Sequence, residues 1–277
     1  MPQSQKRASN GKTARQLVCE RIPDLKLSQE LTSSVTIHAI DIVAPIKLWR
    51  GFEMQVRMAT NNVNFRRSII DHRPAGFLSR HHISNEFYAC SDEGDIQGRF
   101  NNNVSNVMAA IFQSSGIMCE FSSGRSTRTD CGGIPDNVLT MTNGTRALLV
   151  GEFKTPWAHS LIRGIRKPAY RPRLFGQIGM YMYCAGVQYG FLSTYNETIF
   201  CAQMPNTQTG LYELWISPVI THDTVSQAVS QQDAQNPDAY RDMVSLRECL
   251  MYLGLQVQAQ HWRSANNNAA STFYKIA

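Results

Sequence analysis

A short apolar run that ends in charged residues places the strongest constraint on how this 277-residue chain folds. Residues 147–150 read Ala-Leu-Leu-Val and lead into Gly-Glu-Phe-Lys, with Glu152 and Lys154 as the charged pair. Turn-like residues precede the run and Thr155-Pro156 ends it, which indicates a mostly buried strand. A carboxylate and an ammonium there predict either an ion pair at the rim of a sheet or a functional site. In isolation, the ion pair is the commoner explanation.

A second carboxylate, Asp136, follows Pro135 upstream of this strand. Magnesium ions are held in proteins by one or two carboxylates together with waters and substrate oxygens. Such an ion can activate the water that attacks a phosphodiester. Alternate side chains of a strand point the same way, so Lys154 would lie beside Glu152 and could orient that water or stabilise negative charge. Asp136, Glu152 and Lys154 therefore predict a Mg²⁺ site, in which Mn²⁺ could substitute.

A downstream helix adds a third element to this pattern. Gln177 and Tyr181 are one helical turn apart, so both can point from one helix face toward the site. With Pro-Asp, Glu-x-Lys and Gln-x-x-x-Tyr in this order, the chain resembles the PD-(D/E)XK nuclease superfamily. Residues 188–196 resemble the strand and hairpin that follow this helix in fungal members. The resemblance covers roughly residues 90–205.

This resemblance implies an α/β fold with a restriction-endonuclease-like core, in which a central mixed β-sheet is flanked by helices. It also implies that Asp136 and Glu152 bind Mg²⁺ and that Lys154 assists the attacking water. In that family an acid on an earlier helix helps to hold the metal or orients the site. Gln177 and Tyr181 would either support the site or touch the substrate backbone.

Residues 91–113 are the candidate for the earlier helix. One apolar stripe recurs at steps of four and three, formed by Ile96, Phe100, Val104, Met108 and Ile111. Extending it backward by three positions reaches Glu93, which we expect to be the additional acid. The alternative is that Glu93 and its acidic neighbours only favour the helix N-terminus. Gly94 and the run of three Asn at 101–103 disfavour a helix interior.

Positive charge is concentrated in two segments of the chain. The net charge is +6, and four basic residues fall within the first sixteen positions. Five more lie between the Glu-x-Lys strand and the Gln-x-x-x-Tyr helix, where no acid occurs: Arg163, Arg166, Lys167, Arg171 and Arg173. Because Lys and Arg bind phosphates regardless of sequence, this loop predicts a nucleic-acid partner, with Trp157 and Tyr170 as stacking partners. The alternative is a solvated surface loop whose aromatic residues pack on the sheet.

Composition fits one catalytic domain with additions at both ends. The hydrophobic fraction of 43% can supply a sizeable core. We expect a flexible basic tail over residues 1–16, a single nuclease-like domain over 17–277 and a core at about 90–217. No secretory segment or membrane span is recognisable, so we expect an intracellular protein, nuclear or cytoplasmic. The seven cysteines lack zinc-ribbon spacing and are expected to be reduced.

Outside the proposed core, the pattern predicts one or two strands in 35–49, a strand at 211–216, a loop at 221–237 and a closing helix at 239–262. Together with the site residues, these features favour a metal-dependent nuclease acting on DNA rather than RNA. The alternative is a catalytically inactive module of the same fold that binds nucleic acid or a protein partner.

Overall fold

A mixed β-sheet forms the centre of this computed structural model, which describes residues 11–33, 38–65, 69–70, 88–127 and 133–276. Its strand order is β3-β10-β9-β8-β7-β6-β5, and β11 adds to β9. The strands of this sheet are β3 (Ile46–Leu48), β5 (Cys119–Ser122), β6 (Asn137–Met141), β7 (Leu149–Phe153), β8 (Tyr189–Ser193), β9 (Glu197–Pro205), β10 (Tyr212–Ile216) and β11 (Ile220–Thr221). Two pairs are parallel, β7 with β8 and β10 with β3, and the other pairs are antiparallel.

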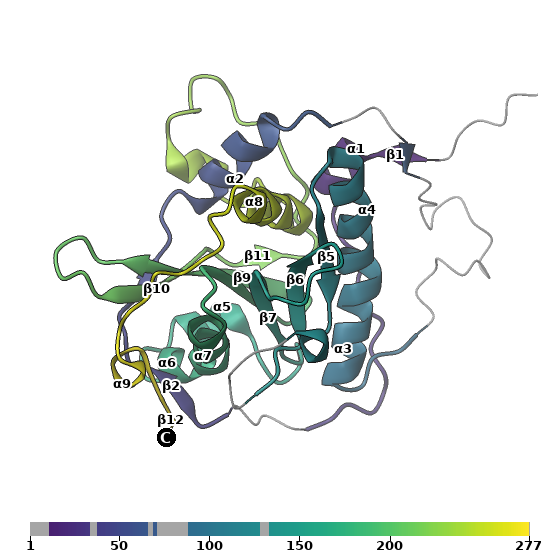
Figure 1. Cartoon of the computed structure of the whole chain (residues 1–277). Coiled ribbons are helices and arrows are strands. Elements are labelled where there is room, and N and C mark those ends of the chain that lie inside the picture. Colours follow the sequence, from purple (N-terminus) through teal and green to yellow (C-terminus); the bar gives the residue numbers. More distant parts are fainter. Residues whose placement is uncertain (1–10, 34–37, 66–68, 71–87, 128–132, 277) are drawn as a thin grey trace, which may run out of the picture.

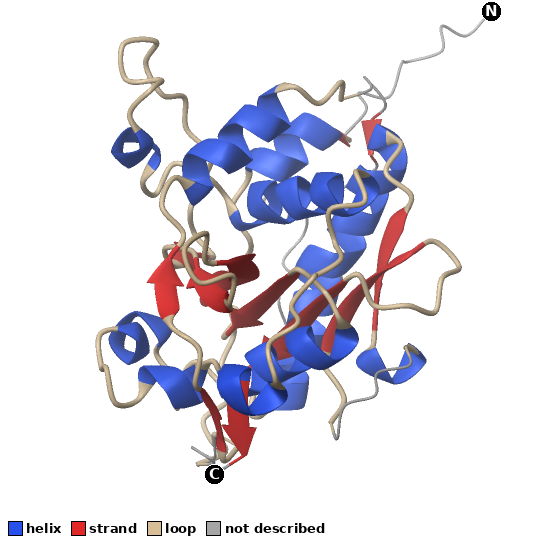
Figure 2. Cartoon of the chain, turned by 60° about the vertical axis from the view of Figure 1, so that its left-hand side comes forward, coloured by secondary structure: helices blue, strands red, loops and turns tan. Residues whose placement is uncertain are grey.

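Helices cover the sheet on both faces (Figures 1 and 2). One group contains α1 (Ala14–Cys19), α2 (Phe52–Asn61), α3 (Glu93–Phe100), α4 (Asn106–Ser115) and α8 (Leu246–Gln258). The other group contains α5 (Leu161–Ile165), α6 (Arg171–Leu174) and α7 (Gly176–Ala185), of which α7 packs against β7 and β8. The expected α/β architecture, with a central mixed sheet flanked by helices, is therefore present.

Smaller elements complete the described chain. Two short strand pairs lie outside the main sheet: β1 (Lys12–Thr13) with β4 (Ile69–Ile70), and β2 (Ile40–Ile42) with β12 (Tyr274–Ile276). The remaining helical turns are η3 (Gly124–Ser126), η4 (Pro237–Tyr240) and α9 (Ala270–Phe273). In the described segments, no helix has the length and apolar character needed to span a bilayer. The six described cysteines form no disulfide with one another, as expected; Cys131 lies outside the described residues.

The buried strand predicted around Glu152 is β7, and all five of its residues are buried. It pairs with β6 on one side and with β8 on the other, so it lies inside the sheet rather than at an edge. The chain leaves β7, passes through α5, α6 and α7, and returns as β8 parallel to β7. This crossover places the basic segment and the Gln177 helix beside the charged end of β7.

The helix expected over residues 91–113 is present, with a change of geometry at its centre. Asp92 caps α3 by accepting a hydrogen bond from the amide of Asp95, whose side chain in turn accepts one from the amide of Asp92. The Asn run at 101–103 lies in a π-helical turn, η2 (Asn101–Ser105), which joins α3 to α4. The wider turn explains how three Asn fit within the helix. The apolar stripe from Ile96 to Ile111 is fully buried.

Two expected boundaries were wrong. The tail does not extend to residue 16, because Lys12 and Thr13 form β1 and a capping box of Thr13 and Gln16 starts α1, whose Leu17 is fully buried. The closing helix does not begin at residue 239. Asp242 has a φ of 58°, which interrupts any helix there, and Ser245 then caps α8.

Aromatic packing fixes the position of β7 against α3. The ring of Phe153 lies 4.8 Å from that of Phe100, and Phe100 stacks on Phe191 of β8 at 5.4 Å between ring centroids. Gly151 allows Phe191 to sit directly over the strand, since a Cβ atom there would lie 2.1 Å from the Phe191 ring. The small residue before Glu152 is thus required by the core.

Replacing Gly151 with Ala is expected to destabilise the protein by about 1–3 kcal/mol, because the added methyl group overlaps a buried ring that cannot move freely. Gly98→Ala is the matched control. Gly98 lies on the exposed face of α3 with no atom near its Cβ position, so Ala should stabilise by up to about 1 kcal/mol. Urea unfolding of both variants measures the difference. Equal stability of the two would contradict this packing.

Candidate metal centre

Three carboxylates from three elements meet at one end of β7. Asp136 immediately precedes β6, Glu152 lies in β7, and Glu93 is the first residue of α3. Because Asn137 pairs with Gly151 in antiparallel register, the residue before Asn137 lies across from Glu152. One oxygen from each carboxylate lies within 4.8 Å of the others, so the three residues could hold a metal ion. Sequence spacing predicted this grouping, including Glu93.

Backbone and helix contacts fix the orientation of Asp136. Its Oδ2 accepts a hydrogen bond of 2.9 Å from the amide of Phe153, which ties it directly to β7. Its backbone carbonyl accepts a hydrogen bond from the side chain of Gln97 on α3. The next residue, Asn137, donates to Asn101 at 2.9 Å. Both helix residues thus position the segment that carries Asp136.

Gln97 and Asn101 were not identified from the sequence as residues of the site. Glu93, Gln97 and Asn101 follow one another at intervals of four residues, which places them on one face of the helix. This polar stripe was a usable signal, but the apolar stripe beside it gave the helix assignment and the Asn run counted against it. The π-helical turn at Asn101 lies at the candidate site, where such turns are frequently found.

Lys154 is the cation of the cluster. Its ammonium lies 2.6 Å from Glu152 Oε1 and 3.6 Å from Glu93 Oε2, and it donates to the carbonyl of Phe153 at 2.9 Å. Glu152 and Lys154 are buried, whereas the Glu93 side chain is 48% exposed. The expected Glu152–Lys154 ion pair is therefore present, but inside the carboxylate cluster rather than alone at a rim.

Burial and mutual repulsion raise the pKa values of the acids of this site. Burial, with a contribution from the Asp136 charge, raises the pKa of Glu152 to about 8 against the opposing effect of Lys154. Burial likewise raises the pKa of Asp136 and of Glu93. The pKa of Lys154 would be lowered by its burial, but the carboxylates around it, Glu152 first, raise it overall. One ammonium is thus surrounded by three acids that resist ionisation together.

The donor set fits a hard divalent cation. Oxygen ligands from carboxylates are those that Mg²⁺ and Mn²⁺ prefer. Glu152 Oε2 is buried and has no hydrogen-bond partner among the described residues. A buried carboxylate oxygen without a partner is costly in a folded protein. A cation would satisfy it and would also relieve the repulsion among the acids.

Gln177 and Tyr181 lie on one face of α7, as predicted, where the Gln177 amide donates to the Tyr181 hydroxyl at 3.1 Å. Both side chains are buried, with 8% and 4% exposed. A Cβ atom at Gly133 would lie 2.8 Å from the Tyr181 hydroxyl, so this ring packs against the segment that leads to Asp136. Of the two expected roles, the burial favours support of the site over contact with a substrate.

The five basic residues after β7 do not share one environment. Arg163 and Lys167 line a cavity of about 660 Å³, and Arg166 is exposed outside it. Arg171 donates to the carbonyl of Ile165, and Arg173 forms an ion pair with Asp41 at 3.0 Å. The structure therefore brings only Arg163 and Lys167 to one cavity.

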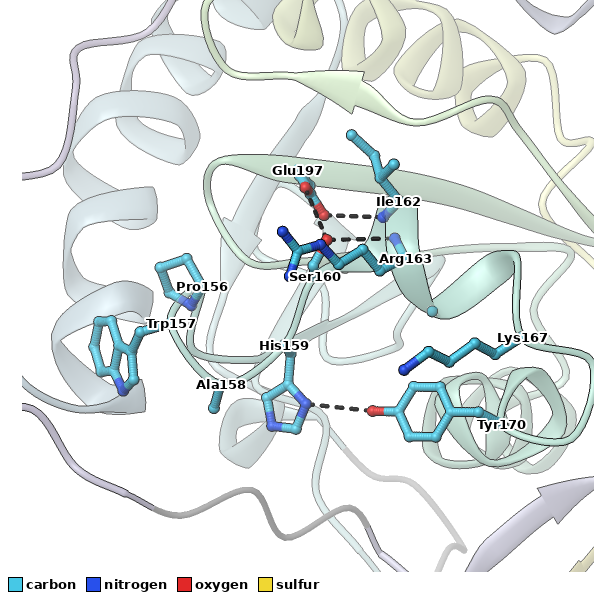
Figure 3. A pocket seen from close by; sticks show the side chains of 11 residues that line it. Pro156, Trp157, Ala158, His159, Ser160, Ile162, Arg163, Lys167, Tyr170 and Glu197 are labelled. Atoms are coloured by element: carbon cyan, nitrogen blue, oxygen red, sulfur yellow. Dashed lines mark hydrogen bonds between the residues drawn. The ribbon is translucent and has the colours of Figure 1, made fainter.

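His159 is a further residue that the sequence did not reveal. It lines the cavity of Arg163 and Lys167 (Figure 3). It also lines a second cavity of about 330 Å³, together with Glu93 and Lys154. Its Nδ1 lies 3.5 Å from the Tyr170 hydroxyl. Burial, with a contribution from the Lys154 charge, lowers its pKa. A single His in a loop carries no motif, so only the folded structure identifies it.

Glu152→Gln is expected to stabilise the metal-free protein by about 1–2 kcal/mol at pH 9, because it removes a charge that burial disfavours in the folded protein. The raised pKa of Glu152 sets the pH range. The contribution of protonated Glu152 to folding stability is complete below its unfolded-state pKa of 4.5 and is lost as the pH rises through its folded-state pKa of about 8. The stabilisation by Glu152→Gln should therefore disappear in acid.

Thermal unfolding with EDTA across this pH range measures the effect, with Glu213→Gln as the control. Glu213 is also a buried acid in the sheet, but it accepts hydrogen bonds from Asn206 and Trp215. Its replacement by Gln should therefore destabilise the protein. Strong destabilisation by Glu152→Gln at pH 9 would mean that this carboxylate has a structural role.

Added Mn²⁺ is expected to raise the melting temperature of the wild-type protein, and more so at pH 8.5 than at pH 6. The acids must be ionised to bind the ion, and the pKa of Glu152, which is raised to about 8, makes that ionisation more complete at the higher pH. The Glu213→Gln variant should keep the shift and Glu152→Gln should lose most of it. A shift equal in all three proteins would place the ion elsewhere.

Comparison with known proteins adds no relative: no family model, no curated protein and no solved structure matches this chain. The resemblance to the PD-(D/E)XK superfamily therefore stays a prediction. The geometry of Glu93, Asp136, Glu152 and Lys154 is the basis for the proposal that follows.

Proposed function

We propose that this protein is a metal-dependent nuclease that hydrolyses phosphodiester bonds, with Mg²⁺ as its ion and Mn²⁺ as a substitute. The observation that carries the proposal is the meeting of Glu93, Asp136 and Glu152 within 4.8 Å, with the Lys154 ammonium 2.6 Å from Glu152. Structural ion pairs balance their charges, whereas this cluster carries three acids for one base. The excess of carboxylates can bind a metal cation, and the lysine beside them can bind the substrate phosphate that the cation also contacts.

Asp136 and Glu152 would hold the ion, and Glu93 would complete the set from the more exposed side. When bound, Mg²⁺ neutralises phosphate oxygens and lowers the pKa of a coordinated water. Lys154 donates to the carbonyl of Phe153, which fixes its ammonium in the lining of the 330 Å³ cavity. From there it can orient the attacking water and stabilise negative charge on the phosphate.

The arrangement of elements supports a restriction-endonuclease-like core of the PD-(D/E)XK type, as the resemblance to fungal members implies. An acid-bearing helix, two antiparallel strands with the Asp and the Glu-x-Lys, and a helix with Gln177 and Tyr181 follow in that order. The parallel strand β8 then pairs with β7. This order of helices and strands supports the proposed core.

Nucleic acid is the proposed substrate, with DNA favoured over RNA. Arg163 and Lys167 provide cations beside the acid cluster, and their cavity meets the cavity of Glu93 at His159. Cations next to a carboxylate site suit a polymer with a phosphate at each repeat, because the ion binds one phosphate and the basic residues bind a neighbour.

Purified protein should cleave labelled DNA in Mg²⁺ or Mn²⁺ and not in EDTA. Asp136→Asn and Glu152→Gln should each reduce the rate at least about 100-fold, because each removes a ligand of the activating ion. Lys154→Met should reduce turnover to a similar extent while retaining the metal-induced stabilisation. Single- and double-stranded DNA and RNA, tested in parallel, identify the substrate class.

Glu213→Gln is again the control and should cleave at the wild-type rate. Cleavage that persists in Asp136→Asn and Glu152→Gln would show that the activity arises elsewhere or from a contaminant. Salt-sensitive binding without cleavage under any metal condition would instead favour the inactive binding module.

A further inference from the structure

A cavity that shares His159 with the pocket of the acid cluster is used only in part by the proposed chemistry. It encloses about 660 Å³ between the end of β7, α5 and the turn that precedes α6. Its polar and aromatic lining includes Trp157, His159, Arg163, Lys167 and Tyr170. Figure 3 shows Lys167 beside the ring of Tyr170, with His159 at the hydroxyl end of that ring. This volume is in the range of small-molecule sites.

The charge of the cavity favours an anion. Within the described part of the chain, neither Arg163 nor Lys167 forms an ion pair, and both side chains are exposed. Glu197 is the acid in the lining. Its carboxylate accepts hydrogen bonds from the amides of Leu161 and Ile162 and from the Ser160 hydroxyl, so its charge is directed at α5. The two cations are left facing the cavity and solvent.

The aromatic lining favours a planar ring next to that anion. Tyr170 is partly buried and its hydroxyl lies 3.5 Å from His159 Nδ1, which holds both rings at the cavity wall. Flat aromatic side chains beside cations are the usual surface for an unpaired base and its phosphate. Bases in a duplex are stacked and paired, and their faces reach such a wall only when the strand is single or the nucleotide is turned out.

His159 connects this cavity to the acid cluster. The smaller cavity, with Glu93, Lys154 and Thr155, shares His159 with the larger one. A strand that presents one phosphate to the carboxylates therefore has a place for its next nucleotide in the basic cavity. The spatial order is acid cluster, His159, then Tyr170 with Lys167.

We propose that the basic cavity binds one unpaired nucleotide next to the scissile phosphate, with Arg163 and Lys167 on its phosphate and Tyr170 and His159 against its base. The substrate is then single-stranded or frayed nucleic acid rather than a fully paired duplex. This inference rests on the proposed nuclease function, because the scissile phosphate is placed at the metal site. Its binding step, however, needs neither the ion nor cleavage.

The test measures binding in EDTA with the Glu152→Gln protein, using fluorescence anisotropy of labelled oligonucleotides. The probes are single-stranded DNA, single-stranded RNA and a hairpin-closed DNA duplex of matched composition. Single strands should bind at least about tenfold more tightly than the duplex. Comparison of the single-stranded DNA and RNA probes shows whether the cavity prefers deoxyribose or ribose.

Variants assign this binding to the cavity. Tyr170→Leu should weaken single-strand binding about tenfold, and Tyr170→Phe should retain it because the stacking ring remains. Lys167→Ala and Arg163→Ala should each weaken binding. Each should also reduce the slope of log affinity against log salt concentration by the equivalent of about one phosphate contact. Lys47→Ala is the matched control, since Lys47 is an exposed lysine on the edge strand β3 and should bind normally.

Equal affinity for single strand and duplex would overturn the inference, as would equal binding by Lys167→Ala and Lys47→Ala. Loss of binding in Tyr170→Phe as severe as in Tyr170→Leu would overturn the stacking role. The two proposals fail separately. If Tyr170→Leu loses single-strand binding and the wild-type protein does not cleave, the nucleotide site is upheld and the nuclease is rejected. If the wild-type protein cleaves and Tyr170→Leu cleaves equally well, the nuclease is upheld and the nucleotide site is rejected.

Discussion

The register between β6 and β7 is the constraint on which the candidate site depends. Pairing of Asn137 with Gly151 brings Asp136 level with Glu152, and the amide of Phe153 then fixes the Asp136 carboxylate at 2.9 Å. A shift of one residue would turn Glu152 to the other face of the sheet and separate the two acids. The aromatic contacts of Phe153 with Phe100 and Phe191 oppose such a shift. The hydrophobic core thus determines the geometry of the charged cluster.

This cluster is maintained at a cost to the fold. Three acids share one ammonium in a largely buried place, and the pKa of Glu152 rises to about 8 because its ionised form is poorly solvated there. A sheet selected only for stability would place apolar or hydrogen-bonded residues at this strand end. Raised pKa values on several acids that could together bind a cation are the pattern expected of a functional site.

The helix α3 and its π-helical turn connect the core to the site. The apolar face of this helix is fully buried, while Gln97 and Asn101 on another face hold the segment around Asp136. On the opposite side of β7, the crossover through α5 to α7 supplies His159, Tyr170 and Lys167. Acidic and basic cavities therefore meet at one strand end because a single parallel crossover follows β7.

The sequence by itself determined the local elements: the buried strand at Glu152, the amphipathic helix that starts near Glu93, and the shared helix face of Gln177 and Tyr181. Each is set by a spacing of two to four residues, which fixes direction within one strand or helix. Motif order also predicted that Glu93, Asp136 and Glu152 would meet. The start of α8 was misplaced because the backbone of Asp242, with its positive φ, gives no clear signal in the pattern.

Only the tertiary structure decided which charged side chains form ion pairs and which face a cavity. Arg173 belongs to the same basic run as Lys167, yet Asp41, distant in the sequence, neutralises it. Gln97 and His159 acquire their places through contacts with other elements, Gln97 at Asp136 and His159 between two cavities. Such contacts depend on how strands and helices pack across the whole chain, and no local spacing encodes them.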